Sequence, residues 1–178
     1  MKNMETPKIG KPFFSLAGFG RRMEFWIIGE MLRQGLDVYR PLVDDKGIDA
    51  IVRRPDGTYA EVQIKARSKD IAEEQAGLFA GIRCAPNPNY WFIFHSAHIG
   101  KNGKMWLMTA AEFMEYASQH TQGKHVGAWT IHLTGVKTNK EVGIKEAYAK
   151  PQFEKFACTS FERLLAGHKA QISEGKEN

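Results

Sequence analysis

Cysteines and long apolar runs are scarce in this sequence, and both absences exclude classes of protein. Its 178 residues include only two cysteines, Cys84 and Cys158, and no CxxC pair, so we expect no zinc site built on thiolates. Two lone cysteines are typical of small core residues in a reducing compartment. No stretch of about 20 apolar residues occurs, and residues 1–11 lack the apolar run of a signal peptide. We therefore expect a cytoplasmic protein with no membrane partner.

Several catalytic signatures are also missing. No nucleophile-elbow motif occurs, and Gly18–Gly20 is too short for a phosphate loop. His95 and His98 lie three residues apart with no evident third metal ligand, so we interpret them as core or loop histidines. The aromatic run Tyr90–Phe92 indicates a buried strand rather than a platform for stacked bases. The chemistry must therefore come from another part of the chain.

Bulk composition fits one soluble domain. Apolar residues make up 43% of the chain and charged residues 25%, which is close to the average for globular proteins. The net charge of +5 and the isoelectric point near 9.2 are compatible with a polyanionic partner, although charge alone does not identify one. We expect an N-terminal arm over residues 1–20, a single domain over 21–168 and a flexible tail over 169–178.

Hydrophobic periodicity predicts an α/β domain with a mixed central sheet and flanking helices. A helix is expected over residues 21–34, where apolar residues recur at helical spacing and Gly35 suits the C-cap. Thr109 and Glu112 form a capping box that begins a second helix, ending near residue 119. Segment 68–84 is ambiguous between helical turn, strand and helix. The remaining predictions are strands over 38–42, 48–53, 59–66, 90–95, 104–108 and 128–133, and a helix over 152–165.

The informative segment is the strand predicted over residues 59–66. Alternate residues of a strand point to one face, so Glu61, Gln63 and Lys65 share a polar face. Val62, Ile64 and Ala66 share the other face, which suits a core. The polar row is either the solvated side of an amphipathic strand or the lining of an active site.

Two acidic residues favour the active-site interpretation. The turn at Pro55–Gly57 folds residues 48–53 back on 59–66 and brings Asp49 close to Gln63. Glu24 lies on the apolar stripe of the first helix, where a carboxylate needs a cation or a donor. Alternatively, Glu24 is a solvated acid favoured by the helix dipole. Arg21 and Arg22 oppose that dipole, which either a phosphate or a neighbouring acid would explain.

These residue types suit a magnesium site. Mg²⁺ prefers oxygen ligands, which Asp49, the Gln63 amide, the Ile64 backbone carbonyl and Glu61 can supply. A bound metal polarises a phosphate and lowers the pKa of an attacking water. Lys65 can orient that water or stabilise charge that develops on the phosphate. The sequence thus predicts a phosphodiesterase site that uses Mg²⁺ or Mn²⁺.

This arrangement resembles the PD-(D/E)XK nuclease superfamily, which carries a helix acid, an Asp on a hairpin strand and (D/E)-x-Lys on the next strand. Here the matching residues are Glu24, Asp49 and Gln63-Ile64-Lys65, within residues 20–67. The Gln-x-Lys variant is similar to archaeal-type Holliday junction resolvases and intron-encoded endonucleases. The resemblance implies a restriction-endonuclease-like αβββαβ core and a DNA substrate. It further implies Asp49 and Gln63 as metal ligands, Lys65 as the catalytic lysine, Glu24 as an accessory acid acting through water, and a homodimer.

Gln63 departs from the acidic residue of that motif. A neutral amide binds Mg²⁺ less strongly than a carboxylate does, and Glu61 on the same face is the candidate to compensate. The alternative is a catalytically inactive nuclease fold that binds nucleic acid. The basic residues near the motif either follow a phosphate backbone or form an ordinary charged hairpin surface. They are Arg53, Arg54, Arg67 and Lys69, beside Lys65.

Overall fold

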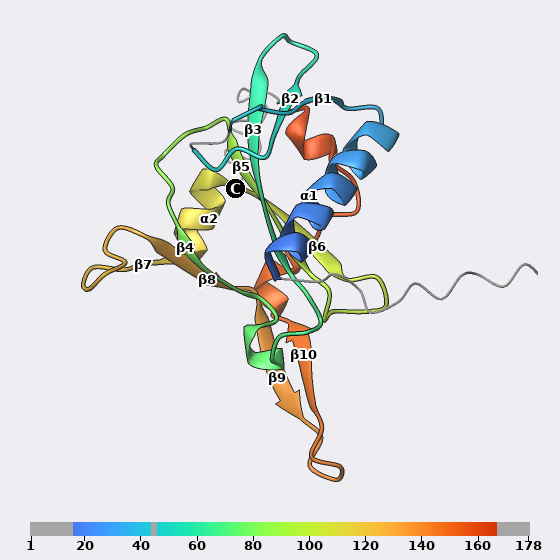
Figure 1. The fold of residues 1–178 in the computed structure, drawn as a ribbon, viewed down its shortest axis with the longest axis vertical. Helices are drawn as coiled ribbons and strands as arrows, with labels where there is room; N and C mark the ends of the chain where they lie inside the picture. Colours follow the sequence, from blue (N-terminus) through green and yellow to red (C-terminus); the bar gives the residue numbers. More distant parts are fainter. Residues whose placement is uncertain (1–15, 44–45, 167–178) are drawn as a thin grey trace, which may run out of the picture.

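A five-stranded mixed sheet forms the centre of the protein (Figure 1). The structure, a computed structural model, describes residues 16–43 and 46–166. The strand order is β1-β2-β3-β5-β6, in which β3 and β5 are parallel and the other neighbours antiparallel. The predicted mixed α/β fold is therefore confirmed. The five strands are β1 (Asp37–Tyr39), β2 (Ala50–Arg53), β3 (Tyr59–Arg67), β5 (Tyr90–Ser96) and β6 (Lys104–Thr109).

Helix α1 (Leu16–Arg33) covers one face of this sheet. Its Ile27, Ile28 and Met31 are buried in one apolar cluster with Val62 and Ile64 of β3, as the alternation in β3 predicts. Gly35 follows the end of the helix, and its positive φ of 83° suits a residue without a Cβ. Helix α1 includes residues 16–20, which the sequence assigned to the end of an N-terminal arm over 1–20. Residues 1–15 lie outside the described residues.

A second layer covers the opposite face. Phe92 and Phe94 of β5 point into it. The ring centroids of Phe92 and of Phe113 in α2 (Ala110–Tyr116) lie 4.4 Å apart, and those of Phe94 and of Phe79 in β4 (Leu78–Ile82) lie 4.8 Å apart. Every residue between β3 and β5 is described, and this connection contains β4 and a 3₁₀ turn instead of the α-helix of an αβββαβ core. The second layer consists of α2 (Ala110–Tyr116) and a three-stranded sheet of β4 (Leu78–Ile82), β8 (Trp129–His132) and β7 (Ser118–Gln119), with η1 (Glu73–Gln75) before β4.

The helix predicted over residues 152–165 is wrong. Two 3₁₀ segments, η2 (Pro151–Phe156) and η3 (Glu162–Leu164), occupy this region. The buried pairs Phe153/Phe156 and Phe161/Leu164 are each spaced by three residues, which matches the three-residue turn of a 3₁₀ helix. Helix α2 also ends earlier than predicted, because Ala117 is extended at φ −89° and ψ 155°. The predicted tail after residue 168 lies outside the described residues.

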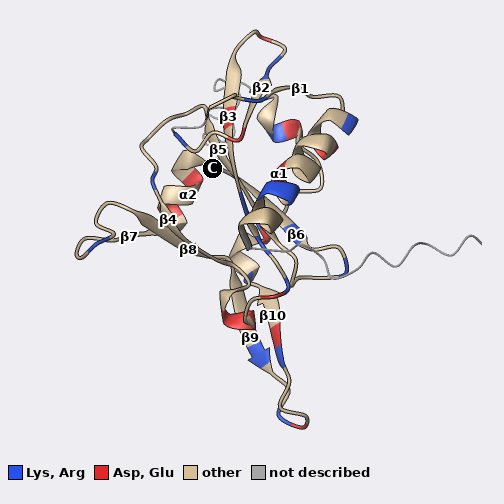
Figure 2. Ribbon diagram, viewed as in Figure 1, with Lys and Arg blue, Asp and Glu red and all other residues tan. Residues whose placement is uncertain are grey.

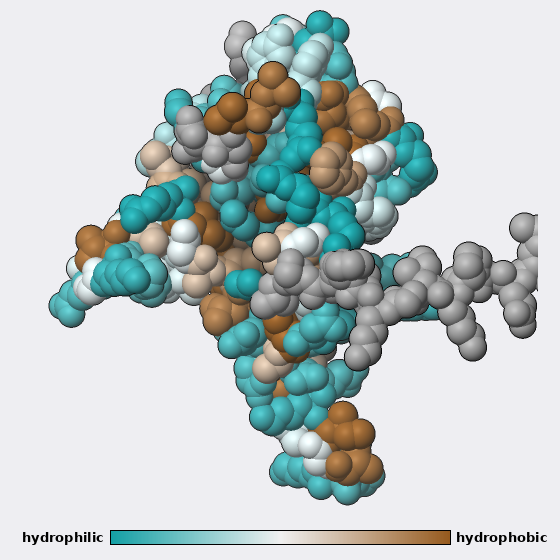
Figure 3. Space-filling view, in the orientation of Figure 1, coloured by the Kyte–Doolittle hydropathy of each residue, from teal (hydrophilic) through white to brown (hydrophobic). Residues whose placement is uncertain are grey.

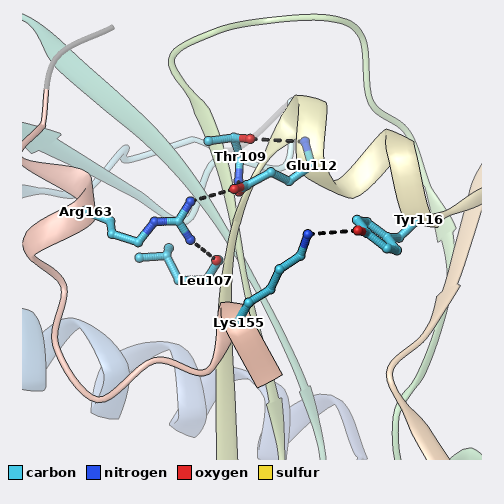
Figure 4. Close-up of polar contacts among 6 residues, drawn as sticks. All are labelled: Leu107, Thr109, Glu112, Tyr116, Lys155 and Arg163. Atoms are coloured by element: carbon cyan, nitrogen blue, oxygen red, sulfur yellow. Dashed lines mark hydrogen bonds and ion pairs between the residues drawn. The ribbon is translucent and has the colours of Figure 1, made fainter. Parts of the chain in front are cut away.

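Polar contacts attach these 3₁₀ segments to the body (Figure 4). Arg163 donates to the Leu107 carbonyl at 2.8 Å and pairs with Glu112 at 2.7 Å. Glu112 also completes the predicted capping box with Thr109, which is therefore confirmed. A hairpin that was not predicted, β9 (Thr134–Thr138) and β10 (Lys145–Ala149), projects from the body. Apolar atoms gather at its tip in Figure 3, where Val142 and Ile144 are exposed.

Candidate active site

The candidate site lies where β2 separates from β3. Strand β2 begins at Ala50 opposite Val62, so β3 extends beyond the end of its partner. Asp49 directly precedes β2, and its amide donates to the Val62 carbonyl at 2.9 Å. Its carboxylate Oδ2 accepts the Ile64 amide at 2.7 Å, which supplies the bond that a longer β2 would have made. This register places Asp49 opposite Gln63, as the hairpin predicts.

Gln63 is a buried amide with an unsatisfied oxygen. Its residue is 7% exposed, and Oε1 has no hydrogen-bond partner among the described residues. An unpaired buried acceptor costs about 1–3 kcal/mol, so such an atom needs an explanation. The amide oxygen is the kind of ligand that a hard cation takes. Gln63 therefore fits the predicted role of metal ligand.

A glycine loop encloses the Gln63 amide from one side. Gly47 has φ +75°, and a Cβ built there would lie 2.1 Å from Gln63 Nε2. Only glycine allows this approach without displacing the amide. Tyr90 holds the loop in place, because its hydroxyl donates to the Gly47 carbonyl at 2.9 Å. No local sequence pattern predicts this contact, since Tyr90 lies 43 residues from Gly47.

Lys65 and Glu61 flank Gln63 on the same face of β3, as predicted. Lys65 is half-buried, and its ammonium makes no ion pair or hydrogen bond with any described residue. The Glu61 carboxylate accepts a hydrogen bond from the Asn87 side-chain amide at 3.2 Å. Glu61 also lines a hollow of about 300 Å³ together with Ile48 and Tyr90. The lysine is thus available for an anionic ligand, whereas Glu61 already has an amide partner.

The Glu24 carboxylate forms ion pairs with two arginines. Its carboxylate pairs with Arg21 at 2.6 Å and Arg40 at 3.6 Å, which meets the need for a cation on the core-facing stripe. Figure 2 marks basic residues near the start of α1. Both arginines line a groove of about 500 Å³ together with Asp49. The charge pattern at the helix start points to Arg21, whereas no spacing connects Arg40 to the motif. The rest of the groove is apolar: Phe25, Pro41, Leu42 and Ile48.

Arg54 has a structural task at the other end of the β2–β3 hairpin. The residue is 3% exposed, and burial lowers the pKa of its guanidinium. Its nitrogens donate to four acceptors at 2.9–3.2 Å, so none of this network depends on a ligand. The four acceptors are the Leu164 and Tyr59 carbonyls, Thr58 Oγ1 and Asn89 Oδ1.

The three basic residues predicted to bind nucleic acid differ in exposure. Arg67 is half-buried, donates to the Leu78 carbonyl at 2.8 Å and lies over the Phe79 ring at 5.2 Å. Burial lowers the pKa of its guanidinium. Arg53 is exposed and pairs with Asp37 at 2.8 Å, and Lys69 is exposed. Arg53 and Lys69 therefore remain the more accessible of the three.

Neither cysteine nor His95 is among the predicted site residues, although Cys84 lines the hollow beside Glu61. Cys158 is buried and burial raises the pKa of its thiol to about 11, while Cys84 is half-buried. His95 is buried in β5 and stacks edge-on against Trp26 at 5.9 Å. Within residues 16–43 and 46–166, no three His, Cys, Asp or Glu side chains gather as a metal site. A cation at the candidate site would therefore depend on Asp49 together with amide and backbone oxygens.

The mixed sheet and its two covering layers define a mixed α/β fold. No protein-family model matches the sequence, and no curated protein matches it. Among solved structures, the chain is similar to a bacterial homing endonuclease, I-Ssp6803I, with a TM-score of 0.55. The alignment covers 93% of this chain and 100% of that chain at 18% identity, and it supports the fold. None of the described helices is long and apolar enough to cross a bilayer.

Proposed function

We propose that the protein is an endonuclease that hydrolyses phosphodiester bonds in DNA with Mg²⁺ or Mn²⁺. The observation that carries the proposal is the unpaired, buried Gln63 Oε1 opposite the Asp49 carboxylate. A bound ion or water is a common reason for a buried oxygen to have no protein partner, and an ion fits here because a carboxylate lies opposite. The similarity to a homing endonuclease supports the same class of activity and a nucleic-acid substrate.

The residues present fit a hard divalent cation. The Asp49 carboxylate, whose Oδ2 accepts the Ile64 amide, would supply a charged oxygen ligand. Gln63 Oε1 and the Ile64 carbonyl would add neutral oxygens, a donor set that suits Mg²⁺. Such an ion, when bound, supplies Lewis-acid polarisation of the phosphate and a more acidic water.

The protein's own residues supply orientation and charge. The bond from the Ile64 amide fixes the Asp49 carboxylate against β3, and the Gly47 loop keeps the Gln63 amide in place. Lys65 lies two residues from Gln63 on the same face, with no competing anionic partner among the described residues. Its ammonium can therefore stabilise the charge that develops on the phosphate oxygens or orient the attacking water.

A second candidate function is DNA binding without cleavage. The observation that favours it is the neutral Gln63, because an amide in place of a carboxylate attracts Mg²⁺ less strongly. This alternative predicts salt-dependent DNA binding with no cleavage under either metal.

Cleavage assays with two variants test the proposal. Plasmid, branched and single-stranded DNA are incubated with protein and Mg²⁺ or Mn²⁺. We expect Lys65→Ala and Asp49→Asn each to lower the cleavage rate by at least about 100-fold, the usual cost of removing one charge-stabilising group. The matched control is Lys137→Ala, since this lysine pairs with Glu146 on the distant hairpin. Cleavage that survives Lys65→Ala would refute the assignment, and binding without any cleavage would favour the second candidate.

A further inference from the structure

The groove beside Asp49 contains two arginines joined by one carboxylate. We infer that Arg21 and Arg40 form a clamp for a backbone phosphate that neighbours the one being cut, and that Glu24 positions the clamp. The inference rests on the proposed function and deepens it, because it assigns the substrate strand a second contact. It also gives Glu24 a task other than that of an accessory acid at the metal.

The first support is the ion-pair geometry. Glu24 is 16% exposed at its side chain and follows the same helix face as the buried Ile28 and Met31. From there its Oε2 meets Arg21 Nη1 at 2.6 Å and Arg40 Nη2 at 3.6 Å. One arginine belongs to α1 and the other directly follows β1, so the carboxylate connects two elements of the fold.

The second support is that Arg40 is held from two sides. Its Cζ lies 4.3 Å from the centroid of the Phe25 ring, and its Nη2 faces Glu24. A guanidinium has five N–H donors in one plane, so a stacked and paired arginine still presents donors to an oxyanion. The Arg40 side chain is 34% exposed and that of Arg21 is 59% exposed. Both groups therefore combine fixed orientation with access to solvent.

The third support is position and charge. Arg21, Arg40 and Asp49 line the same groove of about 500 Å³, which is large enough for part of a nucleotide. The two arginines and Glu24 by themselves carry a net charge of +1, which suits one phosphate, and the cation proposed at Asp49 would offset the charge of that carboxylate. Phe25 and Leu42 are exposed apolar walls of this groove, against which a sugar or base can pack.

The clamp and the accessory-acid roles make different predictions. Both guanidiniums pair with Glu24 Oε2, so an accessory-acid role at the metal would fall to its other oxygen, Oε1. If Glu24 served the metal, its loss would raise the Mg²⁺ concentration required for cleavage. If it positions the clamp, its loss changes DNA binding, and that change appears without any metal.

The test measures duplex binding in EDTA over a salt series, together with cleavage kinetics in Mg²⁺. We expect Arg40→Ala to weaken binding about tenfold and to reduce the slope of log K against log salt by about 1, as for one lost phosphate contact. We expect KM to rise with little change in kcat, and Arg40→Lys to restore part of the binding. The effects of Glu24→Gln and Arg40→Ala should be non-additive in a double-mutant cycle. Glu24→Gln should leave the Mg²⁺ requirement unchanged.

The matched control is a second pair on the same helix. Arg33 and Glu30 also form an i,i+3 ion pair, at 2.7 Å, but do not line the groove. Arg33→Ala should therefore bind and cleave as the wild type does. Wild-type cleavage with unchanged binding and salt slope in Arg40→Ala would overturn the clamp while leaving the nuclease proposal standing. A raised Mg²⁺ requirement in Glu24→Gln would also overturn it, and a wild type that neither binds nor cuts DNA would overturn both.

Discussion

Two buried polar side chains occupy opposite ends of the β2–β3 hairpin, and they differ in one respect. Arg54, at the turn end, is 3% exposed, and its nitrogens reach four acceptors. Gln63, at the open end, is 7% exposed, and its Oε1 has no partner among the described residues. The two side chains are almost equally buried, so they differ in hydrogen bonding and not in burial. Arg54, whose nitrogens have partners, stabilises the fold, whereas Gln63, whose Oε1 has none among the described residues, is available to a ligand.

The backbone explains why the two ends differ. At the turn, the Arg54 amide and carbonyl bond with Thr58 and Gly57, which closes the hairpin. At the other end, β2 begins at Ala50 while β3 continues to Arg67, so Asp49 and Gln63 lie where the pairing of the two strands ends. Breaking the hydrogen bonds of Arg54 should therefore lower the free energy of unfolding, whereas the unpaired Gln63 Oε1 already lowers it. Matched substitutions at the two ends can test this comparison.

Arg54→Met should give the largest change in stability. Methionine retains most of the side-chain volume but leaves buried acceptors such as the Leu164 carbonyl without a donor. We expect the free energy of unfolding to fall by about 3 kcal/mol, the range for a broken buried network. Urea denaturation followed by circular dichroism measures it. The neighbouring Arg53→Met, which removes only an exposed ion pair, should cost less than about 0.5 kcal/mol.

Gln63→Met should have a smaller effect of the opposite sign. Removing an unpaired buried oxygen should leave the free energy of unfolding unchanged or raise it by about 1 kcal/mol. Cleavage should nevertheless be lost, because methionine supplies no oxygen ligand. The same urea titration, beside the plasmid assay, provides both values. A destabilisation as large as that of Arg54→Met would show that Gln63 serves the fold instead.

Gln63→Glu sharpens the same prediction within that experiment. A carboxylate at this buried position should lower the melting temperature in EDTA, because an unpaired charge is costly there. Mg²⁺ should raise the melting temperature of Gln63→Glu more than that of the wild type, since ligand binding stabilises the folded state. Equal shifts in both proteins would place the cation away from residue 63.

The part of the site that sequence could predict is local. The turn at residues 55–57 and the alternation around Gln63 determine the register that brings Asp49 beside it, and both signals lie within one hairpin. Arg40 and Tyr90 reach the site through tertiary packing, which no short-range spacing encodes. The metal, the role of Lys65 and the DNA substrate stay predictions.

The sequence did not predict elements whose apolar pattern is weak, or whose pattern fits two kinds of secondary structure equally well. The β9–β10 hairpin projects from the body, so its strands lack the alternation of a half-buried strand. In the last segment, Phe153 and Phe156 at a spacing of three fit an α-helix as well as a 3₁₀ helix. Pro151 and the contacts of Arg163 with β6 and α2 decide in favour of short turns.

His95 is a third buried polar side chain, and it is titratable. Its substitution should have the smallest effect, a change in how stability depends on pH. It is 3% exposed in β5, and burial lowers the pKa of its imidazole. The unfolded chain therefore takes up a proton at a higher pH than the folded chain, near its ordinary value of about 6.5. The stability contribution is complete above that value and is lost as the pH falls towards the folded pKa.

The measurement is urea denaturation at pH 7.5 and pH 5.0 for the wild type and His95→Gln. Glutamine takes no proton, so the variant should lose less stability between the two pH values than the wild type does. His132, whose pKa burial also lowers, is present in both proteins, so the difference between them isolates His95. An identical pH dependence would mean that the buried imidazole titrates as it does in the unfolded chain. In that case burial alone would not separate His95 from a solvated histidine.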